Sequence, residues 1–70
     1  MKDFIEITLE NTAKAIIAIS SISIIEECPD GKSRVILKER VEKSGLNLDF
    51  IVKNPLVVIR DMIIKAQEQQ

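Results

Sequence analysis

The sequence predicts a small α+β domain, an antiparallel β-meander of about five strands with one C-terminal helix packed on the sheet. Isoleucine-rich segments that favour strands fill most of the chain, a Pro-Asp-Gly turn divides them, and a segment with helical periodicity follows. With 70 residues, of which 46% are hydrophobic and 30% charged, the chain has the size and composition of a folded domain. We therefore treat residues 1–70 as a single domain.

Period-two alternation and β-branched residues mark the strands. Residues 4–9 alternate most clearly between apolar and polar side chains. Ser20 and Ser21 interrupt the longest isoleucine run, as a kink or a single helical turn would. Residues 12–27 could form one helix instead, but their density of isoleucine and serine favours strands. The expected strands are residues 4–9, 14–19, 22–28, 33–39 and 48–52.

One turn and one helix start have specific residue signals. Residues 29–32, Pro-Asp-Gly-Lys, predict a tight hairpin because proline fixes the first turn angle and glycine accepts positive φ. Asn54 as N-cap and Pro55 as the first helical position predict a helix from residue 55 to about 67. An apolar arc of this helix is expected to pack on the sheet, and it contains Leu56, Val58, Ile59, Met62, Ile63 and Ala66.

The composition argues against enzymatic chemistry. The chain has no histidine, which excludes Ser-His and Cys-His dyads and histidine-ligated zinc within one chain. Cys28 lies among acidic residues, so a thiolate nucleophile is the less favoured interpretation. Glu26 and Glu27 are neighbours in a strand, point to opposite faces and cannot act as a pair. We expect a protein that is not an enzyme, with no catalytic, cofactor-binding or metal-binding residues and no cofactor.

Charge and hydropathy limit the possible partners of the protein and its possible cellular location. The net charge is −1 with both signs interspersed, which disfavours nucleic acid and anionic membranes as partners. The apolar run at residues 15–25 is shorter than the roughly 18 residues that span a bilayer. A single cysteine and a start without the pattern of a signal peptide predict a reduced, cytoplasmic location.

Apolar surface in excess of what one helix can cover predicts self-association. Phe4 and Ile16 are expected on the sheet face opposite the helix, and Val57 and Ile64 form a second apolar ridge on the helix itself. These side chains are the expected contact residues of a homo-oligomer, a dimer or a higher assembly. Residues 40–47, a polar loop, could instead cover part of the second sheet face.

The function we predict is a small non-enzymatic protein-interaction or self-assembly module. The alternative is a small regulatory nucleic-acid-binding β-sheet protein, which would need its basic side chains to converge on one face. Those side chains are Lys14, Lys32, Arg34, Lys38 and Lys53.

The order of motifs also matches a known pattern. A strand, a polar turn, an isoleucine-rich strand, an Ile-x-x-Ile-Glu-Glu segment, a Pro-Asp turn, another strand and a short helix follow one another. The matching residues are 4–9, 15–19, 22–27, 29–30, 35–37, and Val52 followed by 57–63. This order resembles the small flagellar FlbD family of bacteria, also called SwrD-like proteins. Asn11-Thr12 stands where the family has Asn-Gly, residues 40–47 look like an insertion, and Asn54-Pro55 replaces an acidic lead into the helix. The resemblance implies the same architecture and a non-enzymatic protein associated with motility, without catalytic residues.

Overall fold

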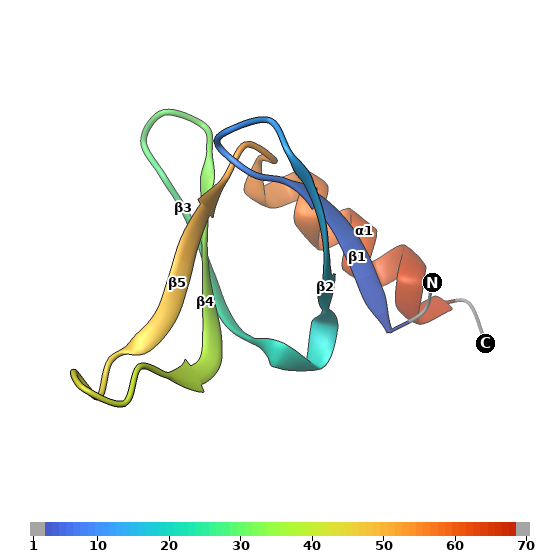
Figure 1. Cartoon of the computed structure of the whole chain (residues 1–70). Coiled ribbons are helices and arrows are strands. Elements are labelled where there is room, and N and C mark those ends of the chain that lie inside the picture. The colour runs from blue at the N-terminus through green and yellow to red at the C-terminus, as the bar shows by residue number, and fades with distance from the viewer. Residues whose placement is uncertain (1–2, 69–70) are drawn as a thin grey trace.

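The structure, a computed structural model, describes residues 3–68 and has the predicted small α+β fold. Five antiparallel strands and a C-terminal helix follow one another in the described residues (Figure 1). In chain order the elements are β1 (Phe4–Thr8), β2 (Lys14–Ala18), the 3₁₀ turn η1 (Ile19–Ser21), β3 (Ile22–Glu27), β4 (Ser33–Arg40), β5 (Asn47–Val52) and α1 (Leu56–Glu68).

The strands divide into two sheets. β1 pairs with β2, and β3, β4 and β5 form a three-stranded sheet in that order. The division falls at η1, where the chain makes one 3₁₀ turn, so β3 leads away from β2 and does not fold back against it (Figure 1). The predicted kink at Ser20 and Ser21 is confirmed, and it splits the predicted meander into two parts. A reversal here would have needed turn residues that the Ser-Ser pair does not supply.

Backbone hydrogen bonds join the two sheets where β5 ends. Leu9 forms an isolated antiparallel bridge with Val52. The Lys53 N–H donates to the Thr8 carbonyl at 2.7 Å, and the Thr8 N–H donates to Asn54 Oδ1 at 2.7 Å. The outer edge of β1 is therefore occupied at its C-terminal end by the chain that follows β5.

Asn54 does not act as the predicted helix cap. The helix begins at Leu56, and the N–H groups of Val58 and Ile59 donate to the Pro55 carbonyl, so Pro55 lies at the cap position. The Asn54 carbonyl accepts a hydrogen bond from the hydroxyl of fully buried Ser33 at 2.7 Å. Asn54 thus links β1, β4 and the helix start. Because its Oδ1 accepts the hydrogen bond from the Thr8 N–H, its side chain is not available to α1.

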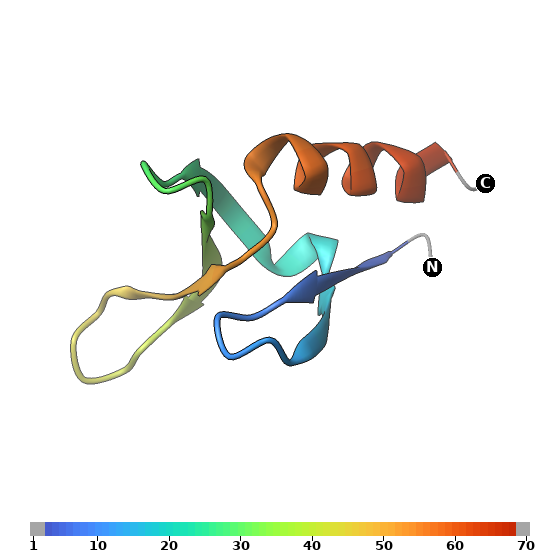
Figure 2. The same cartoon turned by 90° about the horizontal axis from the view of Figure 1, so that it is seen from above.

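The core lies where the helix meets the two sheets. Figure 2 shows α1 along one side of the molecule, with the β1–β2 turn and the β4–β5 loop on the other side. The helix buries Ile59 and Ala66, whereas Val58 of the predicted packing arc is exposed because it lies about 100° around the helix from Ile59. The buried apolar side chains among the described residues are Ile5, Ile7, Val35, Leu37, Val52, Ile59 and Ala66.

The predicted hairpin turn at residues 29–32 is confirmed. The Cys28 N–H donates to the Lys32 carbonyl at 2.9 Å, and the Lys32 N–H donates to Asp30 Oδ1 at 3.1 Å. Gly31 has a φ of 87°, the left-handed conformation for which glycine has no steric penalty. Asp30 and Gly31 therefore have the roles that their chemistry predicts.

Candidate functional site

The four predicted contact residues are all exposed. Their exposed fractions run from 46% at Phe4 to 59% at Ile16, with Val57 and Ile64 between these values. A large apolar side chain gains roughly 1.5–3 kcal/mol from full burial, so each of these side chains retains a large unused gain. Exposed apolar side chains that gather into patches are typical of interaction surfaces.

The structure places these residues on two separate faces. Phe4 pairs with Ala18, and Glu6 pairs with Ile16, so Phe4 and Ile16 share the outer face of the β1–β2 sheet. That face points away from the core, because the alternate residues of β1 are buried. Val57 and Ile64 lie about 150° around α1 from its buried side. The predicted contact residues therefore form a sheet patch and a helix patch, not one continuous surface.

An apolar groove lies between the two sheets, on a side that α1 does not cover. Its volume is about 400 Å³, and no residue of α1 lines it. The groove lies along β2, whose Ala15 and Ile17 face it together with Phe50 from β5. All of its lining residues are apolar: Ile7, Leu9, Ala15, Ile16, Ile17, Leu37 and Phe50. We call it the inter-sheet groove.

The free edge of β2 borders the inter-sheet groove. The Leu9 N–H donates to Ala13 and the Ile19 N–H donates to Asp3, so the odd-numbered residues of β2 bond to β1. The N–H and C=O groups of Lys14, Ile16 and Ala18 therefore point away from β1. Among residues 3–68, the sheet of β1 has no strand on that side of β2. This edge offers backbone donors and acceptors beside an apolar surface.

Sequence reasoning missed several other exposed apolar side chains. Leu48 lies two residues before Phe50 on β5 and therefore on the same face, which alternation along residues 47–52 could have shown. Ile24 is exposed because a register shift between Ile22 and Ile24 turns it outward, and no sequence signal marks that shift. The further exposed residues are Val41, Leu46 and Val58.

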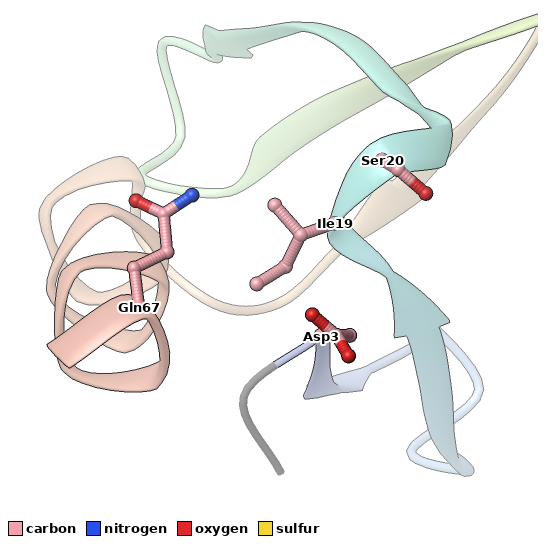
Figure 3. Close-up of a pocket in the computed structure, with 4 residues that line it drawn as sticks. All are labelled: Asp3, Ile19, Ser20 and Gln67. Atoms are coloured by element: carbon pink, nitrogen blue, oxygen red, sulfur yellow. The ribbon is translucent and has the colours of Figure 1, made fainter. Parts of the chain in front are cut away.

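Two of the smaller hollows carry little chemistry. One, of about 370 Å³ between β3 and α1, has Ser23 and Arg60 as its polar lining residues. The other, of about 280 Å³, is lined by Asp3, Ile19, Ser20 and Gln67. Figure 3 shows the Ile19 side chain between Asp3 and the end of α1, whereas the Ser20 hydroxyl points away from the other labelled side chains. Neither arrangement brings a nucleophile and a base together.

No metal-ligating cluster occurs in the part of the chain that the structure describes. Residues 3–68 contain no group of three or more His, Cys, Asp or Glu side chains that could hold a metal ion. Cys28 is a free, partly exposed thiol. The same residues contain no helix with the length and apolar character needed to cross a membrane.

The basic residues named for nucleic-acid binding are spread over both sheets, and three of them have partners. Lys14 Nζ donates to the Thr8 hydroxyl at 2.9 Å in the first sheet. Lys32 Nζ lies 3.2 Å from Glu10 Oε2 and 3.8 Å from Asp30 Oδ2. In the second sheet, Arg34 contacts Glu26 at 3.7 Å and Asp49 at 3.3 Å. Acidic side chains therefore accompany Lys32 and Arg34.

No protein-family model, curated protein or solved structure matches this chain. The resemblance to the FlbD family stays a prediction from the residues.

Proposed function

We propose that this protein is a small non-enzymatic module that acts by self-association. The main support for this proposal is the apolar surface that the fold leaves exposed on the sheet, at Phe4 and Ile16, and on the helix, at Val57 and Ile64. Contact with another subunit would remove this surface from water at a gain of about 25 cal/mol per Å². The inter-sheet groove adds an apolar concavity that the single helix leaves uncovered.

The dimensions of the molecule support the proposal. Its accessible surface is 4982 Å², whereas a compact monomer of this length would expose about 4,400 Å². Its radius of gyration is 12.2 Å, against about 11 Å for a compact domain of 70 residues. The excess of roughly 600 Å² approaches the area that each partner buries in a small specific interface. A second subunit would bring the ratio of surface to volume to the usual range.

The nucleic-acid alternative has less support. Three of the five basic side chains that it needs have hydrogen-bond or ion-pair partners within the fold, and Glu26 and Asp49 flank Arg34. A phosphate backbone would have to displace or overcome these carboxylates. We further propose a reduced, cytoplasmic location, which fits a free cysteine, and a motility-related role that rests on the FlbD resemblance alone.

Sedimentation equilibrium of the untagged chain, from low micromolar to millimolar concentration, tests self-association. We expect the weight-average mass to rise from the monomer value towards a defined multiple of it. The variant Ser44→Lys, in the exposed β4–β5 loop, is the control and should associate like the native chain. A monomer mass across the whole range would contradict the proposal. A salt-dependent gel shift with RNA or DNA, without any rise in mass, would favour the alternative.

A further inference from the structure

We propose that the partner at the free edge of β2 is a second copy of this chain, joined to it by antiparallel pairing of β2 with β2 about a twofold axis at Ile16. This inference rests on the proposed function and specifies the surface that carries it. The juxtaposition behind it is an unpaired strand edge beside the inter-sheet groove.

The backbone geometry of β2 suits this pairing. Its N–H and C=O groups at Lys14, Ile16 and Ala18 point outward, as the register with β1 requires. Around a twofold axis at Ile16, each Ile16 faces Ile16 of the second copy, and each Lys14 faces Ala18 of the second copy. All of the outward-pointing groups of the strand then exchange hydrogen bonds, and the ladder uses the full length of β2.

Backbone pairing and charge together fix the register. The pairing centred on Ile16 places the two Lys14 side chains at opposite ends of the ladder, each facing an alanine. A slide of two residues towards the N-terminal end of β2 places Lys14 opposite Ile16 and leaves the backbone groups of Ala18 without a strand partner. A slide of four residues brings lysine opposite lysine, which is destabilising. A slide in the other direction leaves the backbone groups of Lys14 without partners. The central register is therefore the one that satisfies both the charges and the backbone.

The pairing also covers apolar surface on both faces of the sheet. On the outer face, Ile16 of each copy would contact the other, next to Phe4 and Ala18. On the inner face, Ala15 would face Ile17 of the second copy, beside the inter-sheet groove that these residues line. The result is a continuous four-stranded sheet, β1-β2-β2-β1, which removes the free edge of β2 from water.

The edge itself lacks the features that prevent pairing. Its register with β1 runs through five consecutive residue pairs without a shift. The strand has no proline and no charge other than Lys14 at its end. Val57 and Ile64, by contrast, lie one on each side of Asp61 along the outer face of α1, so the helix patch is interrupted by a charge. These differences favour the strand edge over the helix patch as the primary contact.

Disulfide trapping tests the register. In a background of Cys28→Ser, the variant Ile16→Cys places two thiols on residues whose Cα atoms would lie about 5.5 Å apart, within disulfide range. The matched control Lys14→Cys, on the same strand and face, places its thiols about 14 Å apart across four residues of ladder. The variant Ile64→Cys reports on the helix patch. We expect the two controls to migrate as monomers with or without reductant. Ile16→Cys should give a dimer band that disappears when reductant is added.

Three other results would overturn the inference. Equal dimer bands for Ile16→Cys and Lys14→Cys would indicate contact without the proposed register. A dimer band for Ile64→Cys alone, with a native chain that associates, would contradict the β2 pairing and leave the proposed function in place. No trapping together with a native chain that stays monomeric would reject both. Should Ile16→Cys fold poorly, the Ala18→Cys variant mixed with Lys14→Cys gives the same test, because these residues face each other across the axis.

Discussion

The two hairpins that begin the fold depart from regular geometry in opposite places. The first, β1–β2, has an unshifted ladder but a strained turn, in which Thr12 has a φ of 71°. The second, β3–β4, has a relaxed turn around Gly31 but a shifted ladder between Ile22 and Ile24. Strand β3 of the second hairpin ends in Glu26 and Glu27, whereas β2 of the first hairpin has an apolar free edge. A bulge and charges are the usual protection of a strand edge, so the comparison identifies β2 as the unprotected one.

Proline substitutions should break the comparison most strongly. Ile17→Pro removes an N–H that bonds to β1 and should cost about 3 kcal/mol or more, enough to unfold a domain of this size. Ile16→Pro removes an N–H that points away from β1, so the fold should survive while self-association is lost. Circular dichroism and sedimentation measure the two effects. Equal unfolding by both variants would show that the edge of β2 is not free as described.

The link between the hairpins should give the next largest effect. Asn54→Ala removes the acceptor of the partly buried Thr8 N–H and should lower the free energy of unfolding by about 1–3 kcal/mol. Asn11→Ala is the matched control, because Asn11 Oδ1 accepts only the exposed Ala13 N–H within the turn. Urea denaturation at one protein concentration compares them. A smaller loss for Asn54→Ala than for Asn11→Ala would contradict the role of Asn54 in joining the sheets.

Exchanging the turn chemistry should sharpen the comparison. Thr12→Gly relieves a β-branched residue at positive φ and should stabilise the fold by up to about 1 kcal/mol. Gly31→Ala introduces a side chain at a φ of 87° and should destabilise it by about 1–2 kcal/mol, although the added methyl group meets no atom within 4 Å. The urea midpoints should therefore move in opposite directions. Movement in the same direction would mean that turn strain does not distinguish the hairpins.

The ion pairs of the second hairpin should matter least. Arg34 and its partners Glu26 and Asp49 are about half exposed, so Arg34→Ala should change the free energy of unfolding by less than about 1 kcal/mol. The difference should shrink further in molar salt, where exposed charges are screened. Parallel urea titrations at low and high salt measure it. A loss above 2 kcal/mol that persists in high salt would assign Arg34 a structural role beyond these pairs.

Local chemistry predicted most of the elements, and long-range contacts decided the rest. Alternation along residues 4–9 and the Pro-Asp-Gly turn each specify structure within a few residues, and both were read correctly from the sequence. Local sequence predicts Asn54 as the helix cap. This prediction is wrong because the hydrogen bond that occupies the Asn54 side chain comes from Thr8, 46 residues earlier. The division into two sheets likewise depends on which strands meet in space. The kink predicted at Ser20 and Ser21 indicates only where along the chain the division falls.

The two exposed apolar surfaces could be predicted from the sequence, but the groove beside one of them could not. Phe4, Ile16, Val57 and Ile64 could be named because each is an apolar residue outside the expected packing face. The inter-sheet groove beside β2 requires the relative placement of β2 and β5. No spacing within the chain encodes that placement.

Amide hydrogen exchange at Ile16 and Ile17, followed by NMR at increasing protein concentration, tests the central claim most directly. Ile17 bonds to β1 and should be protected at every concentration. The Ile16 amide should exchange rapidly in the dilute monomer and become protected as the mass rises, because only the second copy can accept its hydrogen bond. An Ile16 amide that stays unprotected in fully associated protein would contradict pairing through β2.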